Sequence, residues 1–177
     1  GESFSLDLVL ENVGVETATA VNAEISTANP AVSFSDDTES IGDIEADNTA
    51  ENQEAYALSL QDGIADQSTI VFDLAITDGQ TNAWDATGSI TVQAPAPKLS
   101  LIGVDDAAEG NGNGILDPGE TATLHILIEN EGHAEMAAGI CDLSFIEPEL
   151  TVNPDDAEQN TSPIAQDASE EMSFEVT

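Results

Sequence analysis

Basic side chains are almost absent from this chain, and that absence limits its partners. One Lys or Arg stands against 36 Asp and Glu among 177 residues, and the formal net charge is −35 at pH 7. A phosphate backbone or an anionic membrane surface would repel such a chain, so we expect no nucleic-acid partner and no direct membrane insertion. The carboxylates must be solvated, screened by salt or neutralised by metal ions. An acidic surface suited to a saline exterior explains most of them, and only carboxylates at a fixed spacing need a further explanation.

Cysteine and long apolar runs are scarce as well. The single cysteine, Cys141, excludes an internal disulfide framework, and its apolar neighbours favour a small core residue over a nucleophile. No stretch approaches the roughly 18 apolar residues of a membrane-spanning helix. The sequence shows no signal peptide, and we expect any targeting segment to lie outside it.

Catalytic motifs are also missing. The sequence contains no nucleophile elbow, phosphate loop, HExxH or CxxC motif. His125 on the outward face of an alternating segment, and His133 in the next turn, have no partner at a recognisable spacing. We therefore expect two surface histidines and a protein that is not an enzyme.

The chain does contain 40% hydrophobic residues in short alternating runs, although only 4% of its residues are aromatic. Such alternation is typical of half-buried strands and not of a disordered acidic tail. It runs through residues 4–10, 70–76, 84–92 and 122–128. With turn signals between the runs, the pattern predicts an all-β fold of tandem immunoglobulin-like β-sandwiches. Tyr56 and Trp84 fall on apparent inward faces, and we expect Trp84 to be a core anchor.

Two segments of the sequence align without a gap at an offset of 118 residues. Residues 1–14, GESFSLDLVLENVG, match residues 119–132, GETATLHILIENEG, and the match continues to Pro30 and Pro148. A shared pattern at a fixed period indicates a tandem array. We predict a first repeat at 1–95 that lacks its N-terminal strand and loop, and a second at 96–177 that lacks its C-terminal strands. On this interpretation the natural protein extends in both directions.

A proline-containing connector, QAPAPK at residues 93–98, ends the first repeat. Two prolines that alternate with small residues favour an extended connector. Lys98 is the only basic residue, so a trypsin-like protease has a single place to cut. We interpret the scarcity of Lys and Arg as a by-product of the acidic composition and not as an adaptation to proteases.

One segment, DDAAEGNGNGILDPGE at residues 105–120, has the spacing of a calcium loop. Calcium takes six to eight hard oxygens, and the EF-hand presents them from positions 1, 3, 5, 7, 9 and 12 of a loop with Gly at position 6. Counted from the first position, these places fall here on Glu109, Asn111, Asn113, Ile115, Asp117 and Glu120, with Gly114 sixth.

The chemistry of these residues suits calcium. Ile115 would offer its carbonyl and Glu120 both carboxylate oxygens, while Asp105 or Asp106 would add a ligand from the preceding strand. Because Glu replaces Asp at the first position, Asp106 is the rival of Glu109 for the leading place. The alternative is a Gly/Asn-rich turn with incidental acids.

The run GNGNGILDPGE followed by ETATLHILIENEG resembles the immunoglobulin-like and CARDB-type repeats of secreted bacterial proteins. Such repeats occur in large surface adhesins and beside the catalytic domains of gingipain-like peptidases, for which the type IX secretion route is common. The resemblance implies a β-sandwich with a calcium loop before its second strand. The ligands that it implies are Asp105, Asp106, Asn111, Asn113, Asp117 and Glu120, with Glu2 as the matching residue of the first copy. The family motif has Asp where Asn113 stands, which implies a weaker site here.

These patterns predict a non-catalytic structural segment of a long extracellular or cell-surface protein, an adhesin shaft or filament. In this interpretation calcium rigidifies the junction between repeats, with ligands from the connector and the next strand. The partners are neighbouring repeats of the same chain, and lateral self-association is left open. A second interpretation is an accessory region of a secreted enzyme such as a gingipain-like peptidase. A third, a module that binds glycans or a host protein, is disfavoured because Tyr56 and Trp84 are expected to face inward.

Overall fold

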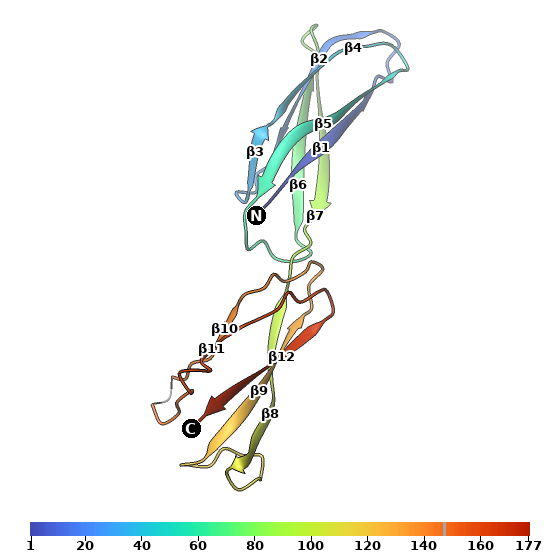
Figure 1. Ribbon diagram of the computed structural model, residues 1–177. Coiled ribbons are helices and arrows are strands. Elements are labelled where there is room, and N and C mark those ends of the chain that lie inside the picture. The colour runs from blue at the N-terminus through green and yellow to red at the C-terminus, as the bar shows by residue number, and fades with distance from the viewer. Residues whose placement is uncertain (147) are drawn as a thin grey trace. The chain divides into compact units, whose positions relative to one another are not determined.

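The computed structural model describes residues 1–146 and 148–177, and it divides into two compact units (Figure 1). Unit 1 is Gly1–Val92 and unit 2 is Gln93–Thr177. The connector therefore belongs to unit 2, and the boundary lies slightly before the predicted one at 95/96. The regular elements of the described residues are all β-strands, and the paired strands are antiparallel. The prediction of an all-β chain is confirmed, and the architecture is consistent with β-sandwiches.

Unit 1 consists of two antiparallel sheets, ordered β1-β5-β3 and β4-β2-β6-β7 in its described residues. Its strands are β1 (Glu2–Glu11), β2 (Ala18–Ser26), β3 (Val32–Asp36), β4 (Thr38–Ile44), β5 (Thr49–Leu60), β6 (Thr69–Thr77) and β7 (Ala83–Thr91). The alternation read from the sequence places one face of β1 and one face of β6 in the core. Leu8, Ile25, Tyr56 and Phe72 are buried, whereas Val9 on the outer face of β1 is 59% exposed.

Trp84 is an exception to this pattern. Its side chain is 48% exposed, so the expectation of a core anchor is wrong. The reason is its place on β7, the last strand of its sheet, where nearly the whole strand is exposed on both faces. Alternation identifies the face that points inward, but it does not show whether anything covers that face.

Unit 2 has a three-stranded sheet, β12-β9-β8, and a two-stranded one, β10-β11. Its described strands are β8 (Pro97–Glu109), β9 (Thr121–Asn130), β10 (Ile140–Asp142), β11 (Glu158–Asn160) and β12 (Ser169–Val176). The core gathers Ile128, Ile164, Met172 and Phe174, and Cys141 packs against it partly buried. Burial is the main cause that raises the pKa of the Cys141 thiol, as expected for a small core residue.

The two units share the pairing of their equivalent strands. Leu10 lies opposite Ala50 in unit 1, and Ile128 lies opposite Glu170 in unit 2. Likewise Asn22 pairs with Ser40, and Ile140 with Asn160. Hence β9, β12, β10 and β11 of unit 2 correspond to β1, β5, β2 and β4 of unit 1. The repeat seen in the sequence is therefore also a repeat of strand pairing, although the partners named here in β12 and β11 lie 120 residues, and not 118, after those in β5 and β4.

A corner after the first of these strands is built in the same way in both units. In unit 1 it comprises residues 12–16, and the Asn12 side-chain amide donates to the carbonyls of Glu16 at 2.8 Å and Ile44 at 2.9 Å. In unit 2 it comprises residues 130–134, and the Asn130 amide donates to the carbonyls of Ala134 at 2.8 Å and Ile164 at 3.0 Å. We call these two segments the corners of unit 1 and unit 2.

Candidate functional site: the loop between β8 and β9

The predicted calcium loop joins β8 to β9 within unit 2. β8 continues to Glu109, which lies opposite Thr121, and the register between the strands becomes irregular after Asp105. Gly112 and Gly114 have φ values of 73° and 75°, which residues with a Cβ adopt only at a cost. The glycine spacing therefore lets the chain fold back over the end of β8.

Asp106 is the centre of the loop. Its side chain points inward, and the residue is only 2% exposed. Its Oδ2 accepts the N–H groups of Gly112 at 3.0 Å and Asn113 at 3.1 Å, and its Oδ1 accepts that of Gly114 at 3.0 Å. The Gly114 N–H is the largest cause that lowers the pKa of the Asp106 carboxyl. This carboxylate is thus ionised and held by the backbone that wraps around it.

A second group of polar side chains meets at Asp117. Its Oδ2 accepts the side-chain amides of Asn111 at 2.8 Å and Asn113 at 3.2 Å. Its backbone N–H donates to Glu120 Oε2 at 3.3 Å. A Cβ at position 110 would lie 3.1 Å from the same Glu120 oxygen and 2.6 Å from the Asp106 carbonyl oxygen, so this position accommodates only glycine.

The structure thus brings together five of the residues predicted from the sequence. They are Asp106, Asn111, Asn113, Asp117 and Glu120. The leading carboxylate is Asp106 and not Glu109, because Glu109 ends β8 as an exposed residue and Asp106 accepts the loop N–H groups. Counted from Asp106, Asn111, Asn113 and Asp117 fall sixth, eighth and twelfth, so the group does not keep the EF-hand spacing.

The other predicted ligands lie outside this group. Asp105 is exposed, and its Oδ1 accepts the N–H of Ala107 at 3.0 Å. The Ile115 side chain is 62% exposed, so only its carbonyl remains a candidate. Glu2 belongs to unit 1, where it begins β1 and is exposed.

The donor set of the loop fits calcium better than a transition metal. Among the described residues, no three His, Cys, Asp or Glu side chains are close enough to hold a metal ion by themselves. A cation here would need amide and carbonyl oxygens beside the carboxylates, and this mixed set of hard oxygens is what calcium accepts. The amide oxygens of Asn111 and Asn113 accept the N–H groups of Asn113 at 3.0 Å and Ile115 at 2.7 Å, and their amide nitrogens donate to Asp117.

The place of the loop corrects one part of the prediction. The connector lies at the Pro97 end of β8, and the loop lies beyond Glu109 at the other end of the same strand. The polar contacts of the loop come from residues of its own hairpin. The connector therefore supplies none of the contacts described for this site, contrary to the expectation of a site shared with it.

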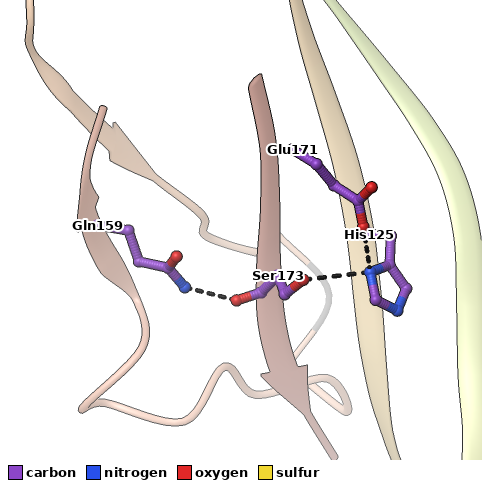
Figure 2. Close-up of polar contacts among 4 residues, drawn as sticks. All are labelled: His125, Gln159, Glu171 and Ser173. Atoms are coloured by element: carbon purple, nitrogen blue, oxygen red, sulfur yellow. Dashed lines mark hydrogen bonds and ion pairs between the residues drawn. The ribbon is translucent and has the colours of Figure 1, made fainter. Parts of the chain in front are cut away.

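A second polar group lies around His125, on β9 and β12 (Figure 2). It contains the three kinds of side chain found in a serine-histidine-acid relay. His125 Nδ1 lies 2.8 Å from Glu171 Oε1 and 3.1 Å from Ser173 Oγ. In a Ser-His-acid relay the hydroxyl and the carboxylate contact opposite ring nitrogens. Here both contacts share Nδ1, so the arrangement is not that of an activated serine. Gln159 closes the group through its amide, which donates to the Ser173 carbonyl at 2.5 Å.

Comparisons with known proteins do not assign the chain. No protein-family model and no curated protein match it. A solved structure, the secreted serine protease VesC from Vibrio cholerae, aligns with a TM-score of 0.33 and 12% sequence identity. The alignment covers 98% of this chain and 42% of that protein, so the chain spans less than half of its length. A likeness this weak carries no argument about function.

In the part of the chain that the structure describes, no helix has the length and apolarity to cross a membrane.

Proposed function

We propose that this chain is a non-catalytic, calcium-binding structural segment of a long extracellular surface protein, such as an adhesin shaft or filament. The observation that carries the proposal is the buried Asp106 carboxylate, held by three loop N–H groups beside the cluster at Asp117. The shared strand pairing of the two units supports the repeat character of the segment.

Calcium would be held by oxygens of Asp106, Asn111, Asn113, Asp117 and Glu120, with the Ile115 carbonyl as a further candidate. When bound, it would neutralise part of the local negative charge and join the end of β8 to the start of β9. A chain with a net charge of −35 has few other means to do so, because its one basic side chain lies elsewhere. The resulting hairpin would resist bending when calcium is present.

In this role, calcium bound at the loop would stiffen the repeat by fixing one end of β8. The two ends of β8 are held in different ways: the connector end contacts the corner of unit 2, and the loop end would be held by calcium. A repeat fixed at both ends of this strand transmits force without local unfolding. In this proposal neighbouring repeats of the same protein are the partners, outside the cell where calcium is plentiful.

Calorimetric titration of the full chain with calcium tests the proposal. We expect one ion to bind with a Kd of about 10⁻⁴ to 10⁻³ M, the range of extracellular calcium modules. Asp117→Asn and Glu120→Gln should abolish this binding, since each removes a charged oxygen from the cluster.

Two matched variants provide the control. Asp105→Asn and Glu109→Gln remove the same charge from the same segment, but their side chains lie outside the cluster, so both should leave the Kd within about twofold. Equal weakening by all four variants would indicate diffuse attraction of counterions to an acidic surface. That result would contradict a built calcium site and with it the proposed function.

A further inference from the structure

An apolar groove runs along one side of unit 1, between β1 and β7. Each of these strands is the last of its sheet, so neither sheet continues across the gap. One hollow of about 430 Å³ is lined by Leu10, Gly14 and Trp84 among others. A second of about 280 Å³ is lined by Leu8 and Ala86 among others. The half-exposed Trp84 therefore belongs to a groove and not to a closed core.

Unit 2 shows what lies along the corresponding edge. There β9, the equivalent of β1, pairs on that side with β8. Leu99 lies opposite Ile128 and Leu101 opposite Ile126, and these positions of β9 correspond to Leu10 and Leu8 of β1. Directly opposite residues of an antiparallel pair point to the same face. A strand like β8 on the edge of β1 would thus direct its two leucines toward the two hollows.

The connector that precedes β8 docks on the corner of unit 2. The N–H of Ala96 donates to Asn130 Oδ1 at 3.1 Å, and the N–H of Glu131 donates to the Ala96 carbonyl at 3.0 Å. A Cβ at Gly132 would lie 2.2 Å from the Ala94 carbonyl oxygen and 2.3 Å from the Ala96 nitrogen. Glycine is required at position 132 because the connector backbone passes directly over it.

The corner of unit 1 has an equivalent asparagine and glycine, but no connector segment lies against it. Gly14 corresponds to Gly132, but a Cβ there would meet only Asn12 Oδ1, at 3.1 Å. Neither glycine is among the residues with a positive φ, so backbone conformation does not account for Gly14. Val13 and Val15 are 79% and 95% exposed. Within the described part of the chain, no hydrogen bond is formed by the N–H groups of Val13, Val15 and Glu16, the equivalents of those that face the connector in unit 2.

We propose that this groove and corner are the docking site for an extended segment equivalent to the connector and the start of β8 in unit 2. The occupant is an extended segment with the chemistry of Ala-Pro-Ala-Pro-Lys-Leu-Ser-Leu, which binds β1 antiparallel by β-strand addition. The prolines set the extended backbone at the corner, and the two leucines fill the hollows. The lysine meets Glu11, the equivalent of Glu129, whose Oε2 lies 3.7 Å from Lys98 Nζ. The inference rests on the proposed function in that the repeat array supplies the segment.

An extended chain tests the docking. A copy of residues 93–118 is placed before Gly1, because Gly119 and Glu120 align with Gly1 and Glu2. Trp84 is the only tryptophan of the chain and lines the groove, so its fluorescence reports on unit 1 alone. We expect its emission to shift to shorter wavelength, and the thermal midpoint of unit 1 to rise by roughly 5 °C or more. The measurement is made with a chelator present, so a failure of calcium binding does not affect it.

Two variants separate docking from other effects of the added residues. Asn in place of both leucines of the copied segment leaves unit 1 unaltered and should remove most of the gain. In the extended chain, Gly14→Ala should remove the gain in thermal midpoint. In the chain without the copy, the same variant should lower the midpoint only slightly, through its tight contact with Asn12. No change on extension, or a gain that survives both variants, would overturn the proposal. A concentration-dependent dimer of the unextended chain with a blue-shifted Trp84 would do so as well, because the occupant would then be a second copy.

Discussion

Tyr56 shows at the scale of one residue how the two units differ. It occupies the place of Phe174 in unit 2, since Leu6 pairs with Tyr56 and Leu124 with Phe174. Tyr56 is 2% exposed, and its hydroxyl has no hydrogen-bond partner among the described residues. Burial first, and then the charge of Glu39, raises the pKa of Tyr56 to about 12. A buried hydroxyl without a partner is a cost that the phenylalanine of unit 2 avoids.

We therefore predict that Tyr56→Phe stabilises unit 1 by about 1 kcal/mol at pH 7. The variant also removes a titration. Because the native pKa lies above the unfolded one, wild-type stability is complete below pH 10 and declines as pH rises toward 12. Urea unfolding followed by Trp84 fluorescence at pH 7 and pH 11 measures both effects.

The reverse change provides the control for this prediction. Phe174 is fully buried, so Phe174→Tyr introduces a hydroxyl at the equivalent place and should destabilise unit 2. If Tyr56→Phe instead lowers the stability of unit 1, the tyrosine hydroxyl has a partner and the explanation by an unsatisfied group is wrong.

The corners show the same comparison at the scale of an element. Asn130 is 1% exposed and makes four side-chain hydrogen bonds, two as donor and two as acceptor. Asn12 makes three, because no connector donates to its Oδ1. We predict that Asn130→Ala destabilises unit 2 by about 3 kcal/mol and Asn12→Ala destabilises unit 1 by about half as much. The difference is the contribution of the docked segment.

Far-UV circular dichroism in urea follows both units, and Trp84 fluorescence identifies the transition of unit 1. Asn48→Ala is a suitable control, because the exposed Asn48 side chain contacts only Glu45, at 3.3 Å, in the hydrogen bonds described for it. Equal losses at the two corners would mean that the connector adds nothing to the corner of unit 2.

Strands and loops could be predicted from the sequence where a local repeating pattern specifies them. The alternation at residues 4–10 and 122–128 predicted β1 and β9, and the Gly/Asn spacing predicted the loop. Sequence reasoning left the choice between Glu109 and Asp106 as the leading carboxylate open, because β8 continues to Glu109 with an irregular register, which no period shows. It also missed the contact of the connector with Gly132. That contact joins residues far apart in the sequence, and the only signal was the Asn-x-Gly shared by both copies.

At the scale of the whole molecule, the composition provides a direct test of how calcium affects the chain. Lys98 is the only basic residue, so trypsin has one bond to cleave in 177 residues. That bond lies in β8, where Lys98 pairs with Glu129 across the sheet and its Nζ lies 2.5 Å from Glu131 Oε1. The surface ion pair contributes little by itself. Cleavage therefore requires β8 to separate from β9, and its rate follows the population of that open form.

We predict that calcium slows this single cleavage although it binds at the other end of β8. If the Kd is about 0.1 mM, 10 mM calcium stabilises the closed hairpin by about 2.7 kcal/mol, or roughly 100-fold in the open population. Electrophoresis of the two fragments over time measures the rate, against a chelator at matched ionic strength, with trypsin activity on a short lysine ester as the control. Glu120→Gln should remove the effect of calcium. Equal rates for the wild type in both buffers would show that β8 opens at Lys98 independently of the loop, and calcium would then not stiffen the repeat through this strand.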